Sequence, residues 1–414
     1  MADVKIFTDN IEGEALNQVY TLAKLPAFEN AKVRIMPDVH AGAGCVIGFT
    51  ADLGDKVIPN IVGVDIGCGM RVVKIGNVEM NGAEFAKLDS VIRTCVPAGH
   101  DVHTKINISA MSKYVNPLYC FKDLRNLDRI GGSMGTLGGG NHFIELDTDD
   151  NGDKYLVIHT GSRNLGKQVA EIYQDIAIQE MSGANRFEAD SAEGRLLYKA
   201  TGRKTEIQKG LAQLVQEYAK KAPKIPKELC YLEGDNRLHY LHDMELCQRF
   251  AVQNRQTIAD TICKAMGWTQ VETFESIHNY ISFKDNIVRK GAISAYKGQK
   301  VIIPMNMRDG CIIGVGKGNA DWNQSAPHGA GRIMSRAAAK ENINLEDYAA
   351  SMAGIFTTSV NQSTIDESPF AYKPMQEIID NIGDTVDIVT SPEVFDEFSI
   401  LNLTYLYPLY DIVP

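Results

Sequence analysis

The stretch that organises the chain reads Val64-Asp65-Ile66-Gly67-Cys68-Gly69-Met70-Arg71. A glycine stands on each side of Cys68, so the backbone can turn sharply and bring the Asp65 carboxylate and the thiol into one small space. A carboxylate and a thiolate that converge in this way can serve as a pair of metal ligands. A second interpretation stays open here, in which Asp65 caps the turn and Cys68 packs beneath it.

Strand-like runs surround this turn. They span residues 33–36, 45–50, 56–62 and 70–75, and another precedes them at 4–7. The Asp65 to Cys68 turn falls between the last two runs, so it is predicted to be a loop on a sheet. The run at 33–36 ends at Pro37 and delivers Asp38 and His40 to a loop just beyond a strand, where functional sites are commonly built.

Three histidines lie in strand-rich parts of the chain. His142 follows the glycines 138–140, and in the strand predicted there it shares one face with Ile144, while Asn141, Phe143 and Glu145 share the other. His159 ends a strand-like run, and His278 lies where strand patterning resumes.

With Asp65 and Cys68, these three histidines exceed the ligand count of one four-coordinate site. Two metal ions that share Cys68 would use all five groups. The residue types do not name the metal, because thiolate and imidazole favour zinc whereas the carboxylate also suits manganese.

Helical periodicity covers residues 12–23, 82–95, 167–181, 205–221 and 238–266. The last three of these form a predicted helical insert over residues 166–267. Because the insert has charged faces and little site-like chemistry, we assign it to scaffold and substrate contact.

Pro327 to Arg336 leads into an alanine-rich helix, and the sequence predicts His328 at or just before the helix N-terminus. Unpaired N–H groups at such a position favour an anion, so a phosphate there would lie beside a nucleophilic imidazole. Arg332 and Arg336 are predicted one turn apart on the same helix face. With Arg163, Arg289 and Lys290 they could form a positive patch; the alternative is that these five residues pair with the abundant acids.

Composition indicates one large globular unit over residues 1–414, with 44% apolar and 23% charged residues. The formal charge of −10 argues against indiscriminate adhesion to nucleic acid, so any such substrate must meet a local basic patch. The eight scattered cysteines include no CxxC pair, which is typical of a reducing compartment. With no signal-like N-terminus and no long apolar segment, a cytoplasmic location and no membrane association are expected.

Seven ordered motifs resemble those of the RtcB-type RNA ligases, collinear from about residue 30 to 375. They are Asp38-Val39-His40, Val64 to Gly69, Gly140 to Glu145, His159 to Arg163, His278-Asn279-Tyr280, Arg289 to Ala292 and His328 to Arg332. The resemblance implies an α+β fold of stacked mixed sheets surrounded by helices.

It also implies a GTP- and manganese-dependent ligase that joins an RNA 3'-phosphate or 2',3'-cyclic phosphate to a 5'-hydroxyl. Two Mn²⁺ ions would be held by Asp65, Cys68, His142, His159 and His278. His328 would attack the α-phosphate of GTP and become guanylylated. A monomer that acts in RNA repair is expected.

The resemblance implies further contacts with nucleotide and RNA. The implied nucleotide contacts are Asn141, Phe143, Glu145, Asn279, Pro304, Asn306, Met307, Gly329, Ala330 and Gly331. The implied RNA contacts are Arg163, Arg289, Lys290, Arg332 and Arg336.

Two stretches depart from the family pattern. Pro304 to Cys311 replaces a Pro-Gly-Ser-Met-Gly guanosine-binding turn, and the chain ends in Pro408 to Pro414 without the usual lysine. These departures concern selectivity for guanine and indicate a divergent paralogue. Two alternative functions therefore stay open: a metal-dependent 2',3'-cyclic phosphodiesterase acting on RNA ends, and a non-catalytic RNA-binding protein.

Overall fold

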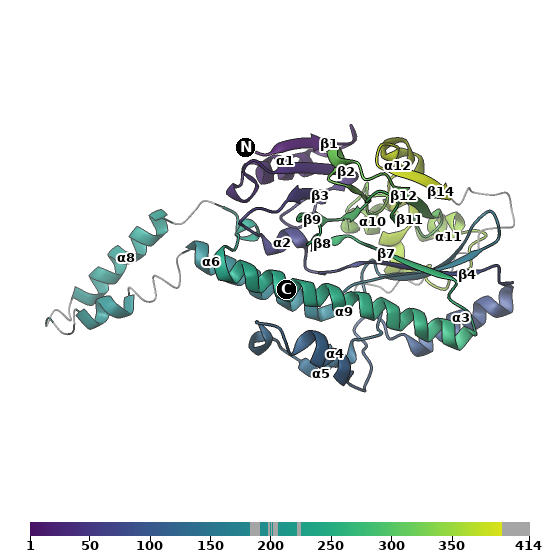
Figure 1. The fold of residues 1–414 in the computed structure, drawn as a ribbon, viewed down its shortest axis with the longest axis horizontal. Helices are drawn as coiled ribbons and strands as arrows, with labels where there is room; N and C mark the ends of the chain where they lie inside the picture. Colours follow the sequence, from purple (N-terminus) through teal and green to yellow (C-terminus); the bar gives the residue numbers. More distant parts are fainter. Residues whose placement is uncertain (183–190, 198, 200, 202–205, 222–224, 391–414) are drawn as a thin grey trace.

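Two larger sheets carry most of the strands (Figure 1). The computed structural model describes residues 1–414 except 183–190, 198, 200, 202–205, 222–224 and 391–414. The five-stranded sheet has the order β1 (Asp3–Ile6), β2 (Lys32–His40), β3 (Ile47–Asp52), β9 (Ile287–Lys290) and β8 (Asn279–Ser282). Only β1 and β2 pair in parallel in it.

The four-stranded sheet is antiparallel throughout and carries the turn at residues 65–68 on one end. Its order is β5 (Phe143–Thr148), β6 (Lys154–Thr160), β4 (Gly69–Gly76) and β7 (Glu272–Ile277). Two smaller sheets complete the strands: β11 (Lys300–Asn306), β12 (Gly310–Gly316) and β14 (Val386–Thr390), and the pair β10 (Ala292–Ser294) and β13 (Ser325–Pro327).

The longest helix, α9 (Gly234–Met266), runs along the body of the molecule in Figure 1. Its buried positions include Cys247, Ala251, Ile258 and Ile262, which are spaced one or two helical turns apart, so that one stripe of the helix packs against the protein. It contacts α6 (Arg163–Ser182) and α3 (Gly82–Cys95) as well as β4 and β6.

The remaining helices are shorter or lie at the periphery. They are α1 (Gly13–Ala23), α2 (Pro59–Val62), α4 (Ile108–Ala110), α5 (Leu127–Gly132), α8 (Ile207–Lys221), α10 (Arg336–Asn342), α11 (Leu345–Ser351) and α12 (Met375–Ile382). Figure 1 shows α8 projecting away from the body. Across the described residues, no helix combines the length and the apolarity that crossing a membrane requires.

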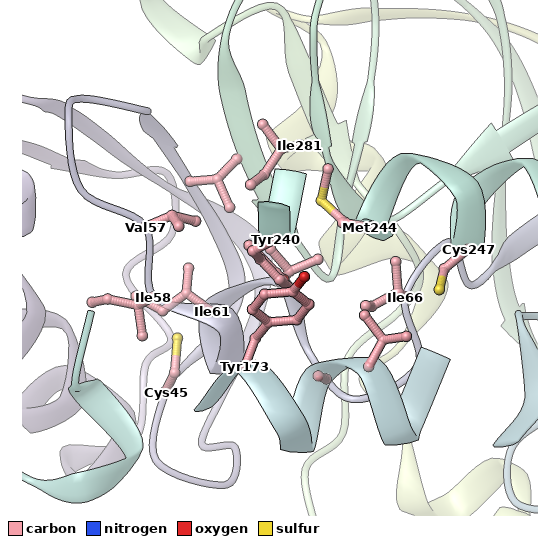
Figure 2. Packing of buried hydrophobic residues seen from close by; sticks show 14 of the residues in the cluster. Cys45, Val57, Ile58, Ile61, Ile66, Tyr173, Tyr240, Met244, Cys247 and Ile281 are labelled. Atoms are coloured by element: carbon pink, nitrogen blue, oxygen red, sulfur yellow. The ribbon is translucent and has the colours of Figure 1, made fainter. Parts of the chain in front are cut away.

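The turn at residues 65–68 is anchored in the largest hydrophobic cluster (Figure 2). Ile66 is fully buried there, close to α6 and α9. Tyr173 and Tyr240, from these two helices, meet edge to face with their ring centroids 5.3 Å apart. Full burial of one side chain such as Ile66 stabilises the folded state by about 1.5–3 kcal/mol, so the position of the turn is fixed by the core.

The predicted mixture of helices and strands is confirmed, and the helix predicted over residues 82–95 matches α3.

The strand predicted over 56–62 is wrong: α2 occupies its second half, because Pro59 is preorganised for the first position of a helix. The strand predicted to end at Pro37 instead continues to His40. The pairing of β2 with β3 shifts register between Ile35 and His40, and a proline, which lacks an N–H, is tolerated at such an interruption. That residues 1–414 form one catalytic unit stays a prediction.

A buried carboxylate on α9 provides a test of the packing. Asp243 accepts hydrogen bonds from the N–H groups of Tyr119 and Cys120 and from the Tyr173 hydroxyl. The change Asp243→Asn would turn an NH₂ group toward these donors, so the free energy of unfolding should fall by about 1–3 kcal/mol in a urea titration. The exposed control Glu245→Gln on the same helix should change it by less than about 0.5 kcal/mol, and equal effects of the two variants would contradict this account.

Candidate active site

The five predicted metal ligands converge on one cluster, in which Asp65 is partly exposed and the other four side chains are buried. The Cys68 Sγ lies 3.4 Å from His142 Nε2 and 3.3 Å from His159 Nε2. His159 Nε2 lies 3.0 Å from His278 Nε2, and His142 Nε2 lies 2.9 Å from an Asp65 oxygen. The donor atoms therefore form two groups, Asp65-Cys68-His142 and Cys68-His159-His278, which share the thiol of Cys68.

A hydrogen bond of His159 turns a lone pair of its ring into this cluster. The Nδ1–H of His159 donates to the Asn141 carbonyl at 3.0 Å, which leaves its Nε2 unprotonated in the neutral ring. His142 Nδ1 lies 3.0 Å from the Leu137 carbonyl and also 3.0 Å from the Arg163 guanidinium. Among the described residues, Asp65 Oδ1 is buried without a hydrogen-bond partner. Facing lone pairs and an unpaired carboxylate oxygen fit a bound cation.

The protonation states support the same conclusion. Burial, followed by the charges of neighbouring histidines, holds the pKa of His159 and of His278 well below its usual value, so both rings are neutral. Burial and then the nearby Asp65 raise the pKa of the Cys68 thiol well above its usual value. A cation that binds here must therefore displace a proton from Cys68, and metal affinity should rise with pH.

Two adjacent residues of α9 hold the loops that carry these ligands. The guanidinium of Arg255 donates to the carbonyls of Gly67 and Thr160 at 2.9 and 2.7 Å. Asn254 accepts from the N–H groups of residues 135 and 136 and donates to the carbonyls of residues 136 and 161. Both side chains are fully buried, so α9 sets the spacing between the Cys68 turn and the end of β6.

Glycines are required at two points in these loops. Gly67 has φ +74°, and a Cβ there would lie 2.8 Å from the backbone of Gln248 on α9. A Cβ at Gly161 would lie 2.2 Å from an oxygen of Asp65. A side chain at either position would displace the turn or its carboxylate.

His328 lies beside the cluster, with its ring centroid 4.7 Å from that of His278. The Asp38 carboxylate lies 2.6 Å from His328 Nδ1 and also accepts the backbone N–H of His328. Asp38 is fully buried, so it orients the ring and leaves Nε2 for chemistry. The predicted helix N-terminus is wrong: His328 follows β13, and α10 begins only at Arg336, where the Ser335 side chain caps it.

A cavity opens beside His328, His159 and His278. Nine of the ten predicted nucleotide contacts line it: Asn141, Phe143, Glu145, Pro304, Asn306, Met307, Gly329, Ala330 and Gly331. The tenth, Asn279, instead accepts from the N–H of Gly291 at 3.1 Å and donates to the carbonyl of Asp65 at 3.4 Å. The predicted strand face shared by Asn141, Phe143 and Glu145 is thus one wall of the cavity.

The five residues of the predicted basic patch do not all lie at the cavity. Arg332 and Arg336 line the cavity, but Arg332 precedes α10, so they do not share a helix face. Arg336 forms ion pairs with Asp366 and Glu367, and no sequence motif marks these two acids.

The other three basic residues lie away from the cavity wall. Arg289 is fully buried and pairs with Asp285 at 2.9 Å, whereas Lys290 donates to the Asn60 carbonyl. The Arg163 guanidinium lies 3.0 Å from His142 Nδ1. Their contact with RNA stays a prediction.

Sequence reasoning also missed Asp147 and Cys311, which lie next to Glu145 behind the cavity wall. The two-residue spacing of Glu145 and Asp147 on β5 puts both on one face, which was a usable signal. Nothing local to Cys311 indicated that it would meet them.

Comparison with known proteins gives a consistent result over nearly the whole chain. The family model described as tRNA-splicing ligase RtcB matches residues 18–122 and 121–393. The RNA-splicing ligase RtcB of Escherichia coli (strain K12) is 29% identical, over 94% of this chain and 95% of that protein. The tRNA-splicing ligase RtcB of Archaeoglobus fulgidus is 26% identical, over 89% and 87%, and that of Nanoarchaeum equitans is 25% identical, over 91% and 89%.

The shared thiol leads to a test by metal analysis. Cys68→Ala removes a donor from both ligand groups at once, so metal bound per chain should fall for every ion in the centre. The loss of packing should cost about 1 kcal/mol of folding stability, which leaves the protein folded. Cys247→Ala, a buried cysteine outside both groups, is the matched control and should keep the full metal content. A folded Cys68→Ala protein with unchanged metal content would contradict the assignment.

Proposed function

The chain belongs to the RtcB family, and on that premise we propose that it is an RNA ligase that joins a 3'-phosphate or 2',3'-cyclic phosphate end to a 5'-hydroxyl end. The observation that carries the proposal is the placement of His328, held by Asp38, against two donor groups that share Cys68. We propose GTP as the nucleotide and two Mn²⁺ ions as the metals.

In this proposal Asp65, Cys68 and His142 would hold one ion, and Cys68, His159 and His278 would hold the other. Bound metal would polarise the phosphates and neutralise the charge of the departing pyrophosphate. Neutral imidazoles and a thiol that ionises on binding are the states these ligands need.

In the first step His328 is the nucleophile. Its Nε2 attacks the α-phosphorus of GTP, a P–N bond forms, and the P–O bond to pyrophosphate breaks. Asp38 keeps the proton on Nδ1 and stabilises the positive charge that develops on the ring. The Gly329 to Gly331 backbone lies along the same wall of the cavity and is proposed to contact the nucleotide.

In the second step the GMP group is transferred to the RNA. An oxygen of the RNA 3'-phosphate attacks the same phosphorus, and His328 leaves. The 5'-hydroxyl next attacks the activated 3'-phosphate and loses its proton to solvent, and GMP departs. A 2',3'-cyclic phosphate would first be opened by water to a 3'-phosphate. We propose Arg332 and Arg336 as the phosphate contacts, because both line the cavity.

The reaction is proposed for a reducing compartment such as the cytoplasm, since all eight cysteines are free thiols and seven of them are buried. The alternatives of a phosphodiesterase and of a non-catalytic RNA-binding protein are not proposed. A non-catalytic RNA-binding protein would not require the five converging donors, and hydrolysis by metal-bound water would not require the oriented His328 nucleophile.

Transfer of label from nucleotide to protein tests the proposal. With Mn²⁺ and GTP labelled at the α-phosphate, the protein should acquire an acid-labile, base-stable label, and His328→Ala should abolish it. His100→Ala, at an exposed histidine, should label like the unaltered protein. Label that persists in folded His328→Ala would overturn the assignment of the nucleophile.

The role of Asp38 is tested in the same assay. Asp38→Ala should slow labelling by about 10²–10⁴-fold, because the ring loses its orientation and its charge partner. Asp38→Asn keeps an acceptor without the charge and should fall in between. The affinity for GTP should change little, so a variant impaired only in nucleotide affinity would refute a positioning role for Asp38.

A further inference from the structure

Glu275 on β7 lies between two guanidinium groups. One of its carboxylate oxygens is 3.0 Å from Nη1 of Arg71 on β4, and the other is 3.0 Å from Nη2 of Arg255 on α9. The exposed fractions of the Arg71, Glu275 and Arg255 side chains are 11%, 15% and 0%. The Glu275 carboxylate therefore joins two cations that have little access to water.

The strand register places this carboxylate against the helix. Glu275 and Arg71 are direct partners in the antiparallel pairing of β7 with β4, and opposite charges at such positions stabilise a sheet. Val73, two residues further along β4, packs in the same hydrophobic cluster as Ile262 of α9. Because alternate residues of a strand share a face, Arg71 and Glu275 also project toward α9, where Arg255 meets them.

Other charged groups on the same two strands have their own partners. Lys74 on β4 pairs with Asp153, and Glu272 on β7 pairs with Lys300. Among the described residues, the acid that pairs with Arg255 is Glu275.

Arg255 uses its other terminal nitrogen, Nη1, for the loops that carry two of the candidate ligands. Nη1 donates to the carbonyls of Gly67 and Thr160, which directly precede Cys68 and directly follow His159 in the sequence. The backbone pairing of β4 with β6 ends at Thr160, so the guanidinium joins the two chains at the point where that pairing stops. The distance of 3.3 Å between the Cys68 thiol and His159 Nε2 depends on this junction.

The junction depends in turn on Glu275. A guanidinium is planar, so a hydrogen bond at one nitrogen fixes the directions of the others. With Nη2 held by Glu275, Nη1 of Arg255 is directed between the two carbonyls. Without Glu275, Arg71 and Arg255 would face each other as two poorly solvated like charges, and Arg255 would be displaced from the carbonyls.

We propose that Glu275 is a positioning residue of the metal centre: through Arg255 it sets the distance between the Cys68 turn and the end of β6, and so allows both ion sites to share Cys68. This inference rests on the proposed function in taking two metal ions as the occupants of the centre. Glu275 is not itself a ligand.

The experiment uses Mn²⁺ alone as the probe, without nucleotide or RNA. Its affinity is measured by calorimetry, and the magnetic coupling between bound ions by electron paramagnetic resonance. Glu275→Ala should weaken binding by about 10–100-fold and reduce the coupling, as the loss of a group that supports metal ligands typically does. Glu275→Gln keeps an acceptor without the charge and should fall between Glu275→Ala and the unaltered protein.

Two further changes test the route through Arg255. Arg255→Lys keeps the charge but lacks the planar fork, so it should also weaken Mn²⁺ binding. The double variant Glu275→Ala/Arg255→Lys should bind no more weakly than the weaker of the two single variants, because both changes break one contact.

Arg71→Met is the matched control. It removes the other cation that Glu275 binds and leaves the pair of Glu275 with Arg255 in place. Resistance to urea should fall in Arg71→Met as it does in Glu275→Ala, whereas Mn²⁺ affinity and magnetic coupling should stay unchanged. The comparison therefore separates positioning of the metal centre from a general effect on stability.

The outcomes separate this inference from the proposed function. Unchanged Mn²⁺ affinity and coupling in folded Glu275→Ala, or an equal loss in Arg71→Met, would overturn the inference even if His328 is labelled. If Glu275→Ala does not fold, unchanged binding in both Glu275→Gln and Arg255→Lys would overturn it. Weakened binding in the variants without any label on His328 would uphold the inference and refute the nucleotidyl-histidine step. An unaltered protein that does not bind two Mn²⁺ ions would overturn the inference together with the two-ion centre.

Discussion

The structure depends on one electrostatic constraint: a thiol, a carboxylate and three imidazoles meet in a buried space, and that space requires a positive charge. Their donor atoms form two groups that overlap at Cys68. Two of the protein's own cations lie nearby. Arg255 binds the carbonyls of Gly67 and Thr160, and Arg163 lies 3.0 Å from His142 Nδ1, the ring nitrogen that does not face Cys68. Arg255 therefore fixes the loops, and we propose that a metal binds the donor atoms that face one another.

Charge pairing also shapes the cavity beside the metal centre. Arg336 is balanced by Asp366 and Glu367, and Glu145 accepts a hydrogen bond from the Cys311 thiol. Arg332, Arg336 and Glu145 line the same cavity, which therefore offers guanidinium groups suited to phosphate and a carboxyl suited to the edge of a base.

The five candidate ligands could be singled out from the sequence because each lies in a short local pattern of glycines and strand ends. That these residues lie together could not be predicted, because it depends on the side chains of Asn254 and Arg255 on α9, and no sequence pattern near these two residues indicates their role. The prediction that His328 lies at a helix N-terminus was wrong, because the glycines before α10 resemble the start of a helix. The helix begins later, where the Ser335 side chain caps it. Asp147 and Cys311 are brought together by sheets formed far apart in the chain, and sequence periodicity carries no information about that contact.

The central claim is that Cys68 belongs to two metal sites at once, and electron paramagnetic resonance of the protein titrated with Mn²⁺ tests it most directly. The account predicts two ions per chain and, at full loading, a spectrum that shows magnetic coupling between them. In Cys68→Ala it predicts the spectrum of two uncoupled ions or of a single ion. A single ion per chain in the unaltered protein, or two ions with no magnetic coupling, would contradict it.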